Sequence, residues 1–232
     1  MNYRSLLPSV LFPSRCVMCG GVLAPGENVC PDCMRENALL TGARCVSCGM
    51  PKELCACSGR ARKWSGVTAP FVYEGGARRG ILRWKYERRT DDTRFWAAAV
   101  AGAVKDSFKD VVFDFIAYVP QTEADMAEKG YNQGELLART AAAYLGVPAE
   151  NALCKLYDTG RQHDKPSVMR SGNVFGVFEP TDRFLPAGKT ILLIDDILTT
   201  GATLEECAKM LLLYGAAEVY CAAAGIDLIS NY

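Results

Sequence analysis

The sequence predicts an α/β protein with a mainly parallel, Rossmann-like sheet, preceded by a small cysteine-rich module. Eight of the eleven cysteines lie between Cys16 and Cys57, and from Val67 onward apolar strand patterns alternate with helical ones. Such alternation favours a parallel sheet covered by helices. With 232 residues, 50% of them hydrophobic and 22% charged, the chain has the composition of a globular protein. We therefore expect two domains, at residues 1–60 and 61–232.

The secondary structure of the second domain follows from its apolar periodicity. The first strand is expected at 68–73, where Pro70 indicates a sheet edge because proline donates no hydrogen bond. The run 190–194 is short and largely apolar, as in a strand covered on both faces. Glycines at 146 and 215 end two of the helices. The remaining strands are expected at 113–119 and 218–223, and the helices at 78–86, 93–108, 132–145 and 202–214.

The cysteines of the first domain occur in four close pairs. Two such pairs supply the four thiolates that bind one tetrahedral zinc ion and leave no open position, so we expect two structural zinc sites. A disulfide framework, an iron–sulfur cluster and redox chemistry at one pair are the alternatives. The spacing leaves cross-braced pairing open beside the simpler sequential one, in which the two ligand sets are Cys16, Cys19, Cys30 and Cys33, then Cys45, Cys48, Cys55 and Cys57.

The charge distribution is uneven although the formal net charge is +0. Residues 60–94 carry ten basic and four acidic side chains, whereas residues 95–232 carry eleven basic and eighteen acidic ones. Such asymmetry favours an anionic partner at the basic segment. The longest uncharged apolar stretch is far shorter than the ~20 residues that a membrane-spanning helix needs. Without a convincing signal peptide either, we expect a cytoplasmic protein.

The most specific segment follows the run 190–194. Asp195 and Asp196 come directly after the apolar strand and precede a loop of small and hydroxyl residues, 199–203, at the start of a helix. Adjacent carboxylates can accept hydrogen bonds from a vicinal diol, and such a loop offers backbone N–H groups and a favourable dipole to a phosphate. Together they suit a ribose 5-phosphate. The simpler alternative is a pair of acids that caps the next turn. The loop lacks the Gly-Lys-Ser/Thr of a Walker A motif.

This segment resembles the PRPP-binding motif of type I phosphoribosyltransferases, and the whole chain resembles the ComF/GntX family of competence-type proteins. Lys129-Gly130-Tyr131-Asn132-Gln133 stands where the family usually has Arg-Gly-Phe-Asn-Gln. Glu87-Arg88-Arg89 stands where the family often has a glycine, and Val177 where alanine is more usual. The other matching stretches are Phe71-Val72-Tyr73-Glu74-Gly75, Trp84-Lys85-Tyr86, Val119-Pro120, Thr159-x2-Gln162 and Arg170-x2-Asn173-Val174-x-Gly176-Val177-Phe178.

The resemblance implies a type I phosphoribosyltransferase fold behind a zinc-ribbon module. It also implies that a nucleophilic acceptor attacks PRPP while Mg2+ sits mostly on PRPP oxygens. Asp195 and Asp196 would hold the ribose hydroxyls as catalytic residues. Lys129 and Asn132 would orient the pyrophosphate turn, although a helix cap at Asn132 is an equal alternative. The remaining PRPP-binding residues would be Thr199, Thr200, Gly201, Ala202, Thr203, Gln121 and Thr122, with a lid containing Lys155, Arg161, Gln162, His163 and Lys165.

A second hypothesis concerns the basic segment 60–94, where ten cations alternate with five aromatic residues. Basic grooves with aromatic platforms bind single-stranded nucleic acid, and the family's association with competence points to DNA uptake. The chain would then be a non-catalytic PRPP sensor or a factor that binds single-stranded DNA. A third reading treats the zinc segment as a docking platform for a competence helicase. The sequence determines neither the acceptor nor the oligomeric state.

Overall fold

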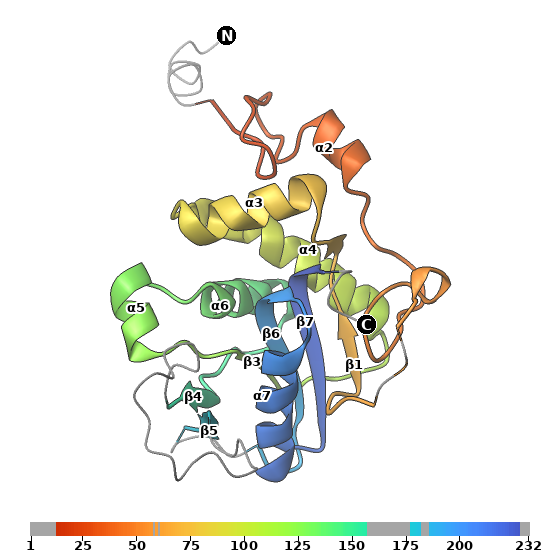
Figure 1. The fold of residues 1–232 in the computed structure, drawn as a ribbon, viewed down its shortest axis with the longest axis vertical. Helices are drawn as coiled ribbons and strands as arrows, with labels where there is room; N and C mark the ends of the chain where they lie inside the picture. Colours follow the sequence, from red (N-terminus) through yellow and green to blue (C-terminus); the bar gives the residue numbers. More distant parts are fainter. Residues whose placement is uncertain (1–12, 58, 60, 157–176, 182–185, 228–232) are drawn as a thin grey trace, which may run out of the picture.

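A computed structural model describes residues 13–57, 59, 61–156, 177–181 and 186–227 (Figure 1). Its main sheet has the strand order β1-β7-β6-β3, all parallel, and β2 extends the β1 edge by pairing with β7. A two-stranded antiparallel sheet, β4–β5, lies beside it. The strands are β1 (Gly66–Thr68), β2 (Phe71–Val72), β3 (Phe115–Tyr118), β4 (Leu153–Lys155), β5 (Phe178–Pro180), β6 (Thr190–Leu198) and β7 (Glu218–Ile226).

Helices cover both faces of the sheet. Along β6, Ile191 and Leu193 pack into the core formed with α7, whereas Leu192 and Ile194 face the core formed with α3, α4 and α6. This alternation is what a strand buried on both faces requires. In Figure 1, α7 lies in front of the sheet. The helices are α2 (Pro31–Glu36), α3 (Gly75–Tyr86), α4 (Thr93–Ser107), α5 (Glu123–Lys129), α6 (Gln133–Leu145) and α7 (Ala202–Leu213), with short 3-10 turns at Lys52–Leu54 and Thr90–Asp92.

The strands depart from the sequence prediction where tertiary pairing acts. The strand expected at 190–194 continues to Leu198, because β7 runs alongside it as far as Ile226. The strand expected at 68–73 is divided into β1 and β2 around Pro70, and α3 begins at Gly75 rather than at residue 78. The structure adds α5, β4 and β5. None of the helices in the described part of the chain is long and apolar enough to cross a membrane.

The cysteine-rich module packs directly against the α/β domain. Cys16, Met18 and Cys33 belong to the same apolar core as Ile81 of α3 and Trp96 of α4. The contact is backbone-close, because a Cβ added at Gly80 of α3 would lie 2.8 Å from the carbonyl oxygen of Val17. Only glycine leaves room for the module at this position of the helix.

Replacing Gly80 tests this contact. Alanine favours helices over glycine by about 1 kcal/mol, yet here its methyl would overlap the backbone of the module, and overpacking of this kind costs about 1–3 kcal/mol. We expect Gly80→Ala to lower the melting temperature of the zinc-loaded protein. Gly102→Ala should raise it, because at this position of α4 the added Cβ has no atom within 4 Å apart from the nearby backbone of its own helix. Equal effects of the two variants, measured by calorimetry, would contradict the close packing.

Candidate functional site

At the carboxyl ends of β3 and β6 the chain leaves the sheet toward opposite faces. After β3 the chain passes through α6 to Ala149, which bridges to Ile116 in β3. After β6 it passes through α7, on the other face, to β7. Ligands of open α/β sheets bind in the crevice at such a switch point. This location brings together the turn 119–122 and the acids Asp195 and Asp196.

The two acids lie within β6, beyond the end of its neighbour β3. Val119 donates the last hydrogen bond of that strand pair to the Ile194 carbonyl, while Asp195 still pairs with Ala223 of β7. Because side chains alternate along a strand, the two carboxylates point to opposite faces of the sheet. The Asp196 amide donates to Oδ1 of Asp195 at 2.8 Å. The expected pair is thus present, but inside a paired strand rather than just after one.

Asp196 forms an ion pair with Lys85, the penultimate residue of α3. Nζ and Oδ2 are 2.6 Å apart, and the two side chains are only 20% and 12% exposed. Burial alone would lower the pKa of Lys85, but the charge of Asp196 and its hydrogen bond raise it. The sequence places Lys85 in a family motif and in the basic segment 60–94, but it does not show that Lys85 pairs with Asp196.

Asp195 is half-buried and differs from its neighbour. Burial and then the charge of Asp196 raise the pKa of Asp195 to about 7, although the Asp196 amide and Lys85 act in the opposite direction. Two adjacent carboxylates do not both ionise easily in such an environment when the nearby cation is paired with only one of them. The site therefore holds one acid paired with a lysine and a second acid that titrates near neutrality.

The loop 199–203 leads from β6 into α7. Gly201 is the N-cap of α7 and adopts φ +76°, a left-handed conformation that favours glycine. Its neighbours Thr199, Thr200, Ala202 and Thr203 are exposed, and the Thr200 hydroxyl accepts from the Ala202 amide at 3.3 Å. The first turn of α7 leaves backbone N–H groups without helical partners, and its dipole favours an anion there.

The turn after β3 is held by helix caps and amides. Thr122 caps α5 in a capping box with Asp125, to which its hydroxyl donates at 2.9 Å. Gln121 donates through Nε2 to Gln133, which in turn donates to the Lys85 carbonyl. The Gln121 Oε1 atom is buried without a hydrogen-bond partner in the described part of the chain. Asn132 caps α6, which is the helix-cap alternative expected for it from the sequence. Its Nδ2 also donates to the Val119 carbonyl.

The expected lid falls largely outside the described residues. Lys155 is partly exposed and ends β4. The other four candidates, Arg161, Gln162, His163 and Lys165, lie outside the described ranges, as do Thr159 and residues 170–176 of the matching stretches. The side chain of Lys129 is not described either, although its backbone ends α5.

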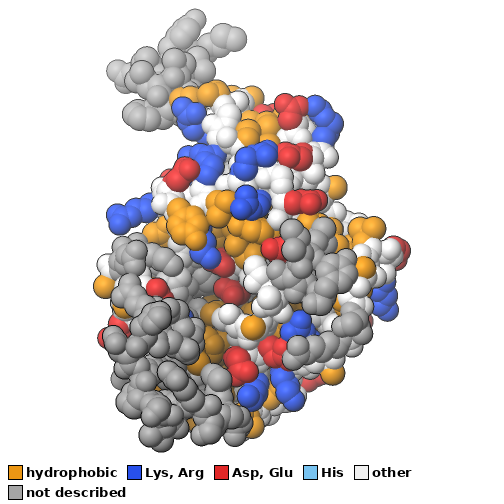
Figure 2. Space-filling model, in the orientation of Figure 1, with side chains coloured by type: hydrophobic (Ala, Val, Ile, Leu, Met, Phe, Trp, Pro, Cys, Tyr) orange, Lys and Arg blue, Asp and Glu red, His pale blue; other side chains and the backbone are white. Residues whose placement is uncertain are grey.

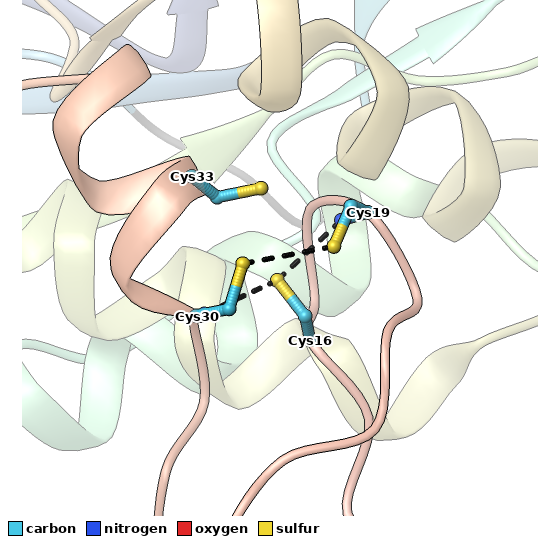
Figure 3. Close-up of side chains that lie close together, drawn as sticks. All are labelled: Cys16, Cys19, Cys30 and Cys33. Carbon is cyan, nitrogen blue, oxygen red and sulfur yellow. Dashed lines mark hydrogen bonds between the residues drawn. The ribbon is translucent and has the colours of Figure 1, made fainter.

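The eight cysteines form two separate clusters, each with four sulfurs within 4.8 Å of one another. Figure 3 shows the first cluster, in which Cys19 and Cys30 Sγ are 3.7 Å apart and the Cys19 and Cys30 amides donate to Cys16. Sulfurs bound to one tetrahedral zinc at about 2.3 Å lie about 3.8 Å apart, whereas a disulfide needs about 2.05 Å. The clusters are Cys16, Cys19, Cys30 and Cys33, and Cys45, Cys48, Cys55 and Cys57.

The sequential pairing is therefore the one found, and cross-bracing is excluded. The four-thiolate donor sets and sulfur spacings fit two structural zinc ions. Such ions would hold the module together, since a segment of this length builds little core of its own.

Comparison with known proteins supports both the α/β domain and the cysteine-rich module. The phosphoribosyl transferase domain model matches residues 132–224, and the double zinc ribbon domain model matches residues 7–63. Competence protein ComFC of Bacillus subtilis is 25% identical over 206 residues, which cover 84% of this chain and 82% of that protein. DNA utilization protein YhgH of Escherichia coli K12 is 26% identical over 223 residues (90% and 96%). Competence protein F of Haemophilus influenzae is 25% identical over 221 residues (90% and 95%).

Among solved structures, the allosteric regulatory enzyme of purine biosynthesis matches with a TM-score of 0.45 and 22% identity, over 62% of this chain and 30% of that one. The chain thus matches a double zinc ribbon followed by a phosphoribosyl transferase domain, and it is similar to the ComF and YhgH proteins at about 25% identity over 84–90% of its length. The fold expected from the sequence, a type I phosphoribosyltransferase domain behind a zinc ribbon, is confirmed.

The raised pKa of Asp195 predicts a stability that depends on pH. The unfolded chain releases this proton near pH 4, whereas the folded protein keeps it until about pH 7. The folded state therefore binds more protons in this interval, and stability falls as the pH rises through it. We expect Asp195→Asn to raise the melting temperature at pH 8, by about 3–6 °C for a protein of this size, and to have little effect at pH 4.

Asp114 provides the control with the opposite sign. The Thr190 amide and then Lys189 lower its pKa, so this carboxylate stabilises the fold above about pH 4 and loses that effect on acidification. Asp114→Asn should therefore lower the melting temperature at neutral pH. If both variants changed stability in the same direction, the titration assigned to Asp195 would be wrong.

The two clusters predict two zinc ions per chain. Metal analysis of the purified protein should give about two zinc ions, and Cys33→Ser or Cys48→Ser should each give about one. Cys154→Ser, at a cysteine outside both clusters, should leave the zinc content unchanged. Loss of both ions from either single variant would contradict two independent sites.

Proposed function

We propose that this protein binds PRPP with Mg2+ at the carboxyl ends of β3 and β6 and transfers its phosphoribosyl group to a nucleophilic acceptor. The observation that carries the proposal is the junction of β6 and α7, where two acids precede an exposed hydroxyl-rich loop at a helix N-terminus. A ribose 5-phosphate presents the complementary groups, a diol and a phosphate. The match to the phosphoribosyl transferase domain supports the same assignment.

Each half of the junction has a distinct task under this proposal. Asp195 and Asp196 accept hydrogen bonds from the ribose hydroxyls, and Lys85 holds the carboxylate of Asp196 through its ion pair. The 5-phosphate lies in the loop formed by Thr199, Thr200, Gly201, Ala202 and Thr203. Backbone amides of the first turn of α7 and exposed hydroxyls supply its donors.

The turn after β3 lies where the pyrophosphate of PRPP would sit. Gln121 and Thr122 are the donors proposed there. Both the hydroxyl and the amide of Thr122 donate to Asp125 in this structure, so Thr122 would exchange one of these bonds for a bond to pyrophosphate. Mg2+, when bound with PRPP, would neutralise charge on the departing pyrophosphate. The acceptor forms a bond to the anomeric carbon, while the bond from that carbon to pyrophosphate oxygen breaks and pyrophosphate takes its electron pair. The protein accelerates this step chiefly by orienting the partners.

A second candidate is a non-catalytic role in DNA handling, because relatives are named DNA utilization and competence proteins. Figure 2 shows several Lys and Arg side chains around α3 on one face. Of the five aromatic rings in the basic segment, Trp64, Phe71 and Trp84 are buried. Tyr86 is 66% exposed and remains available for base stacking. Of the nine cations of this segment that the structure describes, five are paired with acids, namely Arg62, Arg79, Arg83, Lys85 and Arg89.

Calorimetry of PRPP with Mg2+ tests the first candidate. We expect the wild type to bind and the double variant Asp195→Asn/Asp196→Asn to bind at least about tenfold more weakly, because two charged hydrogen-bond acceptors are lost. Asp114→Asn, at the opposite end of the sheet, should bind as the wild type does. Binding by the wild type justifies a screen for acceptors with release of pyrophosphate as the readout.

A zinc-loaded, folded wild type that binds no PRPP would refute the proposed function. In that case binding of a labelled single-stranded oligonucleotide, measured against salt concentration, decides whether the second candidate holds. Reversal of charge at Arg78, Arg79, Arg88 and Arg89 should abolish that binding if the basic segment is responsible.

A further inference from the structure

Trp64 connects the second cysteine cluster to the phosphate loop. Its indole Nε1 donates to the carbonyl of Val46 at 2.9 Å, and Val46 directly follows the cluster residue Cys45. The far edge of the ring lies against Gly201, where an added Cβ would be 2.8 Å from Cη2 of Trp64. Only 6% of Trp64 is exposed. One buried side chain thus contacts the zinc module at one end and the N-cap of α7 at the other.

Arg62 contacts the phosphate loop on both sides of Gly201. Its guanidinium lies 5.2 Å over the Trp64 ring. Nη2 donates to the Thr200 carbonyl at 3.0 Å, and Nη1 pairs with Glu205 of α7 at 2.6 Å. The Arg62 and Glu205 side chains are only 13% and 16% exposed, so this pair is better shielded from solvent than a surface ion pair. Thr200 and Glu205 flank Gly201, and Arg62 therefore fixes the loop against the first turn of the helix.

The second cluster also shares its apolar core with the loop. Cys48 and Met50 pack in the same core as Trp64, Leu198 at the end of β6, and Leu204 in α7. The first cluster packs elsewhere, because Cys16 and Cys33 belong to the core on the opposite face of the sheet. A disturbance of the second cluster is therefore expected to reach the phosphate loop, whereas a disturbance of the first is not.

We propose that Trp64 and Arg62 are positioning residues that couple the second zinc site to the phosphate loop. Metal bound at Cys45, Cys48, Cys55 and Cys57 fixes the backbone of Val46, and Trp64 and Arg62 transmit that order to Thr200, Gly201 and Glu205. A loop ordered before binding holds its amides toward the 5-phosphate without a further entropic cost. The coupling to ligand affinity rests on the proposed function, whereas the coupling to loop order does not.

Ligand binding to zinc-loaded Trp64→Phe and Arg62→Gln tests the proposal. Both variants should bind ribose 5-phosphate about 3- to 10-fold more weakly, the cost of a lost hydrogen bond or partly buried ion pair. Both should bind Mg-pyrophosphate as the wild type does, because the proposed pyrophosphate turn lies at the end of β3. The matched control is Trp96→Phe, a buried tryptophan in the other core, which should change neither affinity.

Hydrogen exchange at amides 200–205 separates this proposal from the proposed function. Exchange should be faster in Trp64→Phe and Arg62→Gln, and unchanged in Trp96→Phe, whether or not PRPP binds. It should also be faster in Cys57→Ser than in Cys19→Ser, which remove one ligand from the second and the first cluster. Unchanged exchange in the Trp64 and Arg62 variants, equal responses of the two cysteine variants, or equal weakening of both ligands would each overturn the coupling.

A wild type that binds neither ribose 5-phosphate nor Mg-pyrophosphate refutes the proposed function alone. The exchange measurement then still decides whether the second zinc site orders the loop.

Discussion

The ion pair between Lys85 and Asp196 is the interaction on which the arrangement of the site depends. Two adjacent carboxylates at the end of a buried strand repel each other and lose hydration, and both effects oppose their ionisation. Lys85 compensates one charge through its ion pair with Asp196, while burial and the charge of Asp196 raise the pKa of Asp195 to about 7. The cation comes from α3. That helix packs at Gly80 against the backbone of the first cysteine cluster. The electrostatics of the strand end thus depend on a packing contact in the ribbon.

The two zinc clusters consequently support different halves of one site. The first packs against α3, the helix that supplies Lys85. The second packs with Trp64 and the end of β6, next to the loop that leads into α7. A ribbon that packs into both cores contributes more than a solvent-exposed appendage would. On the coupling proposed above, zinc binding would organise ligand binding as well as the fold of the module.

Local patterns determined how much the sequence could predict. The cysteine spacings, the apolar run before Asp195 and the glycines at 146 and 215 are short-range signals, and each correctly predicted the presence of its cluster, strand or helix end. The extension of β6 to Leu198 depends on pairing with β7, and the pairs of Lys85 with Asp196 and of Arg62 with Glu205 join residues more than 100 positions apart. No periodicity encodes such contacts. These contacts could be identified only from the folded structure. The same is true of the choice between sequential and cross-braced cysteine pairing.

The charge balance of the crevice also limits what kind of ligand fits it. A plain phosphate or pyrophosphate near Asp196 would meet a carboxylate whose one cation, Lys85, is already engaged. A diol placed there would instead donate hydrogen bonds to the acids, while anionic groups on either side of it reach the amides of α7 and the turn after β3. A bound divalent cation would reduce the remaining repulsion. On the proposed function, this arrangement suits a molecule with a diol between two anionic groups, as in PRPP, better than it suits an isolated phosphate.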